Sequence, residues 1–424
     1  MSTLTARLLA RAPAPADGLP KMPPDSAYRW VEPHLVLGHE ATIALLIERL
    51  RRAGKRIRYP ERCFFAADHF TPPATAERAG ILKKYLEFVE DEGVPQRHLF
   101  QGISHQLMVE DARCLPGAVI VGADSHTTMA GALGAFAAGF GSTDILAVLA
   151  TGAVAIRVPE AIRVRWTGAL HRACSGKDLA LDLMRRFGEG GAAYRALEFV
   201  DSTDSRICMA DRLTVCNLAV DAGAKNGVVI PDEVTLDWLR ARDGHAPALD
   251  GLGPGDDADY ADTLDLDVTS LEPLVARPGS PADVIPAREA SQEKLHQVFI
   301  GSCAGGRFED LRDAAEVLRG HRVRPTLRLV VTPASQAVYR RAVREGVVEV
   351  LIEAGAMVTA SACGACGGID KGLLADGEVC ISTSNRNFRG RMGSTEARIY
   401  LASARTAAAS ALAGRVVDPR EFTP

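Results

Sequence analysis

Three cysteines have the spacing and setting most suited to metal chemistry. Cys363 and Cys366 form a Cys-x-x-Cys pair, and Cys303 precedes a predicted helix whose dipole would favour the thiolate. The pair alone is ambiguous, because this spacing occurs in zinc ribbons, redox dithiols and iron-sulfur proteins. The sequence holds no second Cys-x-x-Cys for a four-cysteine zinc ribbon. Gly367-Gly368 also replace the helix start expected after a thioredoxin-type pair.

Three thiolates would hold a 4Fe-4S cluster and leave one iron without a protein ligand, free to act as a Lewis acid. On spacing alone, the alternative of three small buried apolar side chains weighs equally. Nine cysteines in 424 residues, an odd and sparse number, argue against a disulfide framework. The other six are interpreted as packing residues: Cys63, Cys114, Cys174, Cys208, Cys216 and Cys380.

Two carboxylate-histidine groups could move protons. Asp68 directly precedes His69, and Asp124-Ser125-His126 places one residue between carboxylate and imidazole. A neighbouring carboxylate sets the tautomer and basicity of an imidazole for acid-base work. Each group taken singly is more commonly a structural pair, and His105 carries a weaker signal of the same kind.

Arg386 and Arg391 flank a turn rich in Gly and Asn, and their guanidinium groups would suit bidentate binding of carboxylates. A solvated loop with two arginines is the commoner explanation. The two Asp-His groups, the three cysteines and the two arginines all follow predicted strands. These strands are at 63–67, 118–121, 297–300, 356–360 and 379–383. Helices are predicted at 177–187 and 308–318, and from 336 to a stop at Gly355. Ligands of α/β sheets bind beyond the carboxyl ends of strands, so the pattern predicts an α/β fold with one composite site.

Composition and length set outer limits on function. A net charge of −4 and the lack of a basic stripe argue against nucleic acid as a partner. The apolar stretches are too short to span a membrane, and the first residues lack a secretory h-region, so the expected location is the cytoplasm. We expect a loose N-terminal leader over residues 1–24 and three domains, at 25–157, 158–275 and 276–424.

Several segments together resemble the aconitase superfamily, and within it the large subunits of isopropylmalate-type dehydratases. They are Gly122-Ala123-Asp124-Ser125-His126-Thr127, Phe299-Ile300-Gly301-Ser302-Cys303, Cys363-Gly364-Ala365-Cys366 and Ser382-Thr383-Ser384-Asn385-Arg386 with Gly390-Arg391-Met392-Gly393. The resemblance runs from about residue 30 to the C-terminus. It implies a three-domain aconitase-like fold, with mixed sheets flanked by helices, and a hydro-lyase. Such an enzyme moves a hydroxyl between neighbouring carbons of a small anionic hydroxy acid.

The resemblance also implies a role for each candidate residue. Cys303, Cys363 and Cys366 would ligate a 4Fe-4S cluster, with Asn217, Ser302 and Asn385 around it. The catalytic set would be Asp68, His69, His105, Asp124, His126 and Asp221, and the substrate-binding set Ser125, Arg386 and Arg391.

The chain length carries a further implication. Single-chain members of the superfamily append a swivelling domain that supplies the serine acting as catalytic base, and this sequence ends before such a domain. The resemblance therefore implies a separate small subunit that carries the serine, and a chain that is inactive alone. Homoaconitase, citraconate-type hydratase and dimethylmalate dehydratase large subunits are alternatives of the same class.

Some positions depart from the family pattern. Ala304-Gly305 stand where Thr-Asn is usual, Ala365 replaces Pro, Gly279 replaces a common His, and Asp221 replaces Glu. These departures affect the expected substrate more than the chemistry. Ala304 and Gly305 also favour one alternative of another class, a non-catalytic scaffold subunit with an ordinary zinc or an empty cysteine site. A second such alternative is a regulatory or RNA-binding relative that uses cluster loss as an iron signal, and the acidic charge balance argues against it.

Overall fold

A computed structural model describes residues 2–13, 19–23, 25–96, 98–204, 206–253 and 258–422. The chain forms two compact units, each built from separate stretches. Unit 1 comprises Met1–Phe100, Leu107–Thr167 and Ala192–Leu266, and unit 2 comprises Gln101–Gln106, Gly168–Gly191 and Asp267–Pro424. The expected α/β class is confirmed. The three-domain division at 157 and 275 stays a prediction.

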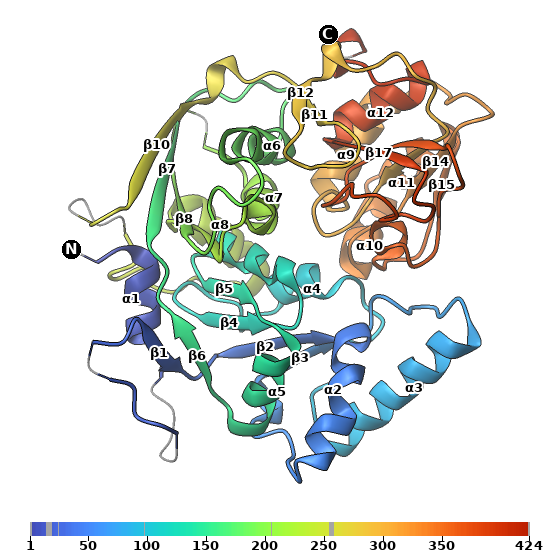
Figure 1. Ribbon diagram of the computed structural model, residues 1–424. Helices are drawn as coiled ribbons and strands as arrows, with labels where there is room; N and C mark the ends of the chain where they lie inside the picture. The colour runs from blue at the N-terminus through green and yellow to red at the C-terminus, as the bar shows by residue number, and fades with distance from the viewer. Residues whose placement is uncertain are drawn as a thin grey trace. The chain divides into compact units, whose positions relative to one another are not determined.

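Unit 1 contains a four-stranded sheet in the order β3-β2-β4-β5, in which every neighbouring pair is parallel. The strands are β2 Leu35–His39, β3 Cys63–Ala66, β4 Val119–Gly122 and β5 Phe136–Gly139. The helices α2 Glu40–Arg52, α3 Ala76–Asp91 and α5 Ser142–Thr151 belong to the same part of the unit, and α2 and α3 lie side by side (Figure 1). Leu46, Phe65 and Phe88 are buried in the core that they share.

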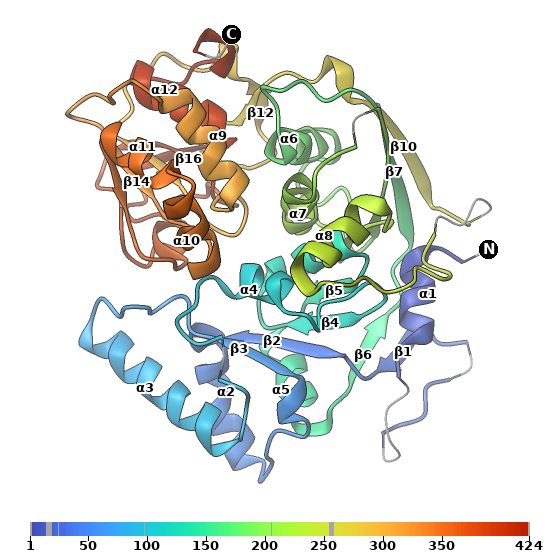
Figure 2. The same ribbon diagram turned by 180° about the vertical axis from the view of Figure 1, so that it is seen from behind.

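A second sheet of unit 1 has the order β10-β7-β8-β9. Its strands are β7 Ala161–Gly168, β8 Ala196–Thr203, β9 Asn226–Val229 and β10 Asp262–Asp267, and β7 and β10 run alongside each other in both views (Figures 1 and 2). The short antiparallel pair of β1 Tyr28–Val31 and β6 Val154–Arg157 belongs to this unit, as do α7 Met209–Leu218, α8 Glu233–Asp243 and the 3-10 helices η2 Ser125–Leu133 and η3 Ala219–Ala222.

The expectation of a loose leader is wrong for residues 4–11, which form α1 Leu4–Arg11. Leu4 and Leu8 are fully buried, and the side chain of Thr3 caps the helix by accepting from the amide of Ala6. The carboxylate of Glu198 in β8 accepts hydrogen bonds from the amides of Leu4 and Thr5, at 3.1 and 2.7 Å. Residues 1, 14–18 and 24 of the expected leader lie outside the described residues.

Unit 2 is built on a seven-stranded sheet in the order β12-β11-β17-β16-β13-β14-β15. Its strands are β11 Leu274–Ala276, β12 Val284–Pro286, β13 Gln297–Ile300, β14 Arg328–Val331, β15 Ala356–Val358, β16 Val379–Ser382 and β17 Arg398–Ala402. The run from β17 to β15 is parallel throughout. The helices of the unit are α6 Gly176–Phe187, α9 Phe308–Leu318, α10 Gln336–Arg344, α11 Val347–Glu353 and α12 Ala404–Ala413, and α4 Ser104–Glu110 begins in it.

Alternate residues of this sheet face two different apolar cores. Val298 and Ile381 pack with α9 and α12, which lie side by side (Figure 2). Phe299 and Cys380 point to the other face and pack with Cys366. The period-2 alternation of strands thus places the Cys-x-x-Cys segment on the face that α9 and α12 leave uncovered.

The helix predicted from 336 to Gly355 in unit 2 is divided into two helices, α10 and α11. Ser335 caps α10 as expected, by accepting from the amide of Val338 at 3.2 Å. The helix ends early because Gly346 has a left-handed φ of 73°, and α11 begins directly after it. Among the residues that the structure describes, no helix has the length and apolar character needed to cross a bilayer.

Candidate active site

In unit 1, acidic and imidazole side chains gather where the parallel strands end. β2 ends in His39, with Glu40 next in the chain; Asp68-His69 follow β3, and Asp124 follows β4. The strands are parallel neighbours, with His39 opposite Ala66, so their carboxyl ends lie at one edge of the sheet. The predicted Asp-His groups therefore lie together within this unit.

Asp68 and His69 form the tightest pair of the group. Asp68 is fully buried, and its Oδ1 accepts a hydrogen bond from His69 Nδ1 at 2.6 Å. The ring of His39 stacks on that of His69, with 4.1 Å between centroids and 9° between planes. His39 Nε2 lies 3.7 Å from Asp124 Oδ2, which links the two Asp-His groups.

The proton of His69 is held strongly. Burial alone would lower the pKa of this imidazole, but the charge and hydrogen bond of Asp68, with the charges of Glu40 and Asp124, raise the pKa to about 9. His69 is therefore a cation at neutral pH, poised to give a proton rather than to take one.

His126 has a carboxylate on either side. Its Nε2 lies 3.3 Å from Oδ2 of Asp221 in η3, and its Nδ1 lies 3.5 Å from Oδ1 of Asp124. Asp221 thus reaches the imidazole, although it is one methylene shorter than the Glu that the resemblance leads us to expect there. Ser125 Oγ lies 3.5 Å from His126 Nδ1, and Asn217, which is fully buried in α7, donates to the sulfur of Met129 in the same η2.

In unit 2, Cys303 follows β13, Cys363 and Cys366 follow β15, and Asn385 follows β16. All of these strands belong to the parallel run. The Asn385 side chain joins two of the cysteines, because its Oδ1 lies 3.7 Å from Cys303 Sγ and 3.6 Å from Cys366 Sγ. Its Nδ2 also donates to Cys303 Sγ at 3.6 Å. Cys363 packs against the apolar cluster that contains Cys366. All three thiols thus belong to one region of unit 2.

The loop with Cys303 is held closely by its neighbours. Ser302 has a φ of 74°, unusual for a residue with a side chain, and its Oγ accepts from the amide of Ala304 at 3.1 Å. A Cβ on Gly305 would come within 2.4 Å of the Cβ of Thr383, so no larger residue fits there in this packing. The side chain of Thr383 fills the space beside Gly305, and its hydroxyl hydrogen-bonds to the backbone of Gly301.

His105 lies in the segment of the chain that groups with unit 2. The amide of Ile103 donates to Ala334 O at 2.8 Å, and the amide of Ala334 donates to Gly306 O at 2.8 Å. A Cβ on Gly102 would overlap the backbone of Ser335, so the segment needs glycine to approach this closely. Two backbone hydrogen bonds thus connect the segment of His105, a buried residue, to the cysteine loop.

Arg386 and Arg391 are half-buried and lie on the loop after β16. Arg386 is next in sequence to Asn385, and the carbonyl of Arg391 lies against Gly368, just after the Cys-x-x-Cys pair. The buried Lys177 in the first turn of α6 donates from Nζ to the carbonyl of Ser384 at 2.7 Å. The structure thus brings the predicted cysteines and Asn385 together in unit 2, with the loop that carries both arginines.

Three residues of these groups escaped the sequence reasoning: His39, Glu40 and Lys177. The signal for the first two was available, because His39-Glu40 end a short apolar strand just as the recognised groups do. Lys177 offered no such signal, since a lysine in a helix is usually solvated. The single composite site stays a prediction, because the two groups of residues belong to different units.

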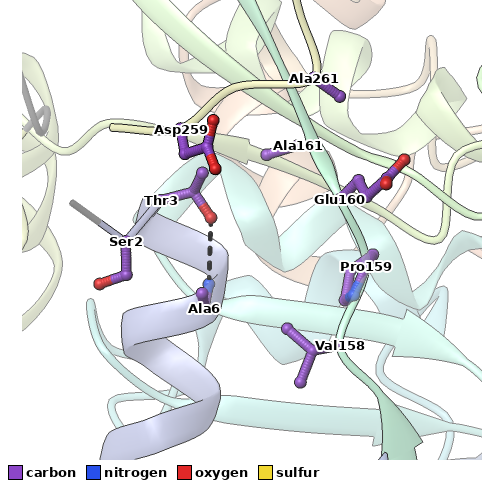
Figure 3. A pocket seen from close by; sticks show the side chains of 9 residues that line it. All are labelled: Ser2, Thr3, Ala6, Val158, Pro159, Glu160, Ala161, Asp259 and Ala261. Carbon is purple, nitrogen blue, oxygen red and sulfur yellow. Dashed lines mark hydrogen bonds between the residues drawn. The ribbon is translucent and has the colours of Figure 1, made fainter. Parts of the chain in front are cut away.

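One pocket of unit 1 holds none of these residues. It has a volume of about 390 Å³, lies beside the start of α1 in unit 1, and is lined by small side chains with Glu160 and Asp259 (Figure 3). The pocket is open to the surface, and no histidine, cysteine or arginine lines it, so it offers none of the groups that the candidate residues supply.

Comparison with known proteins defines the class that the fold and these residues indicate. Residues 20–414 match the family model described as the aconitase family (aconitate hydratase). The chain belongs to the aconitase family.

The names of individual relatives are more specific than the name of the family. The chain is 46% identical to "3-isopropylmalate dehydratase large subunit 1" of Methanopyrus kandleri, over 91% of this chain and 92% of the relative. The proteins of the same name from Archaeoglobus fulgidus and, without the number, from Nitratiruptor are each 43% identical, over 92% of this chain and 93% of the relative. Among solved structures, the holo-form of Thermococcus kodakaraensis aconitase X has a TM-score of 0.53 and 13% identity, and the match covers 87% of this chain and 88% of that one. That likeness shows the fold alone.

Proposed function

We propose that this chain is the large subunit of a hydro-lyase that acts on 3-isopropylmalate together with a separate small subunit. The observation that carries the proposal is the set of large-subunit relatives, 41–46% identical over at least nine-tenths of both chains. The anionic hydroxy-acid substrate suits two half-buried arginines on the loop after β16, because a guanidinium binds a carboxylate through two parallel hydrogen bonds.

The donor set of unit 2 fits an iron-sulfur cluster. Cys303, Cys363 and Cys366 would supply three thiolates, and the amide of Asn385 is already within hydrogen-bonding reach of two of the sulfurs. An amide that donates to cluster-bound sulfur tunes the potential and stability of a cluster. With three protein ligands, a 4Fe-4S cluster would supply Lewis-acid pull on the substrate hydroxyl through its open iron. Ser302, buried in the same loop as Cys303, would complete the surroundings within unit 2.

The acidic and imidazole groups of unit 1 would handle the protons. A hydroxide is a poor leaving group, so dehydration needs a proton delivered to it. His69, a cation at neutral pH, holds a proton that it could deliver, while Asp68 fixes the ring through Nδ1. His126 is oriented by Asp124 and Asp221, and Ser125 Oγ lies beside its Nδ1. His105, in unit 2, stays a candidate for the same acid-base work. The base that removes the carbon-bound proton would come from the small subunit, as a serine on its swivelling domain.

The test is reconstitution. The chain is co-expressed under anaerobic conditions with candidate small subunits, and turnover of 3-isopropylmalate is followed by the absorbance of the unsaturated intermediate. Homocitrate, citramalate and 2,3-dimethylmalate are run in parallel. We expect turnover of 3-isopropylmalate by the pair and none by either chain alone. A preference for another hydroxy acid would correct the substrate, and turnover by this chain alone would refute the two-subunit assignment.

A further inference from the structure

Glu40 is a buried carboxylate with an unusual set of partners. It is the first residue of α2 and has no exposed surface. Its Oε2 accepts a hydrogen bond from the amide of Asp68 at 3.1 Å, and its Oε1 accepts from the amides of His69, at 2.7 Å, and Phe70. Three successive backbone amides after β3 therefore converge on one carboxylate.

This arrangement determines the conformation of the turn that carries the catalytic pair. Successive amides that point to one side form a concave anion-binding surface, which in other proteins commonly receives a phosphate. Here the anion is an internal side chain, and its position at the N-terminus of α2 is favourable for a negative charge. Because two of the three amides belong to Asp68 and His69, the carboxylate fixes the backbone from which both side chains project.

A metal site is the obvious alternative reading, since ligand atoms of His39, Glu40, Asp68 and His69 all lie within 4.8 Å of one another. The geometry opposes it. The lone pair of an imidazole nitrogen lies in the plane of the ring, and a bound metal sits about 2.0–2.1 Å from that nitrogen. The rings of His39 and His69 are nearly parallel with centroids 4.1 Å apart, so their in-plane lone pairs cannot meet at one ion. Glu40 is moreover committed to backbone amides.

We propose that Glu40 is a positioning residue, an internal carboxylate that shapes the turn after β3 so that Asp68 and His69 are presented together. Only the expected effect of Glu40 on turnover rests on the proposed function. Its contacts with the backbone amides lie within this chain and need no partner. The charge of Glu40 acts on His69 as well. The other charged or titratable groups facing this ring are Asp68, Asp124 and His39. Tyr85 of α3 donates from its hydroxyl to the carbonyl of Ala66, the last residue of β3.

The first experiment needs no activity. Amide hydrogen exchange is measured at residues 68–70 in the purified chain and in Glu40→Gln, in which the amide NH₂ would face a backbone N–H. We expect exchange at these three amides to become about tenfold faster or more, while the strands β4 and β5 keep their protection. Glu48→Gln is the matched control, because Glu48 lies on the same helix with its side chain 73% exposed. Unchanged exchange in a folded Glu40→Gln protein would overturn the proposal.

The second experiment uses the reconstituted two-subunit enzyme. Glu40→Gln should lower kcat by about 10- to 100-fold with KM changed less than about threefold, as for other residues that orient a catalytic group. The basic limb of the pH profile should also move to lower pH, because one negative charge that favours the protonated ring is gone. Glu40→Asp, which keeps the charge but shortens the reach, should lower kcat without that shift. A Glu40→Gln enzyme with the kinetics and pH profile of Glu48→Gln would refute the role, whereas inactivity of the unsubstituted pair would count against the proposed function alone.

Discussion

His69 pairs through Nδ1 with the carboxylate of Asp68, and the raised pKa of its imidazole links folding to pH. The pKa of His69 is raised from 6.5 to about 9 in the folded chain, so the folded state binds this proton more tightly than the unfolded state. The stabilisation is fully present below about pH 6.5 and is lost as the pH rises through about 9. We expect the free energy of unfolding to fall by up to about 3 kcal/mol across that window from this group.

The measurement is urea unfolding at pH 6.5 and pH 9.5 for the natural chain and His69→Gln. The substituted chain should lose clearly less stability between the two pH values, since it lacks the raised group. Other titrating residues contribute equally to both proteins and cancel in the comparison. Equal losses would mean that His69 is not protonated in the folded chain at neutral pH.

The cysteines allow a matched comparison at the same scale. Cys366 and Cys380 are both buried in one apolar cluster, and burial raises the pKa of Cys380 to about 12, which suits a packing residue. Cys366→Ala should abolish iron and sulfide retention in anaerobically purified protein, because two thiolates remain for the cluster. Cys380→Ala should retain both at the natural level. Equal iron content in the two variants would contradict the ligand role of Cys366.

At the scale of elements, the first turn of α6 anchors the loop that follows β16. Asp178 accepts from the amide of Leu274 at 2.9 Å in β11, and Lys177 donates to the carbonyl of Ser384, one residue before Asn385. Both side chains are buried, so each contact is made away from water. One helix turn thereby connects two strands of the sheet at the end that carries the cysteines.

Lys177→Met should therefore loosen the cysteine site without unfolding the chain. The buried carbonyl of Ser384 would lose this donor, which costs about 1–3 kcal/mol, and Asn385 would be less firmly placed. We expect cluster loss under mild oxidation, followed by visible absorbance, to become several-fold faster. Arg186→Met is the control, since Arg186 lies on the same helix, half exposed and paired with Asp182. Cluster loss at the same rate in both variants would exclude an anchoring role.

The element scale also shows what the sequence could and could not predict. Short apolar strands followed by Asp-His, Ser-Cys or Cys-x-x-Cys were predictable, because buried parallel strands read as continuous apolar runs. β13 and α9 match the predicted residues, and β3, β4, β15 and β16 differ from them by one or two residues at their ends. The break between α10 and α11 was missed because a glycine inside a helical pattern can be tolerated, and only the φ of Gly346 decides.

The site was less predictable where its support comes from distant residues. Glu40 follows its strand visibly, yet its role depends on amides 28 to 30 positions along the chain. Likewise, the side chain of Thr383 fills the space beside Gly305. Gly305 is one of the departures from the family pattern, and no local sequence pattern reveals that Thr383 packs against it. Such long-range contacts follow from the register of sheets, which periodicity alone does not fix.

At the scale of the whole molecule, the chain is interleaved, since each unit takes up three separate stretches. The stability of unit 1 then depends on segments far apart in sequence, and α1 is the extreme case. Its first amides are bound by Glu198, whose Oε2 also accepts from the hydroxyl of Tyr260 at 2.9 Å. One buried carboxylate thus connects the beginning of the chain, β8 and the segment before β10.

This makes the N-terminal helix a structural part of unit 1, and its removal should be costly. Deleting residues 2–11 would expose the surfaces that bury Leu4 and Leu8, each worth about 1.5–3 kcal/mol, and leave Glu198 buried without two of its donors. We expect a fall in Tm of about 5 °C or more by calorimetry, and a smaller fall for Glu198→Gln, which loses charge but keeps its shape. Glu160→Gln changes an exposed carboxylate across the pocket from the same helix (Figure 3) and should leave Tm within about 1 °C, because exposed ion pairs contribute little. An unchanged Tm after the deletion would restore the interpretation of these residues as a loose leader.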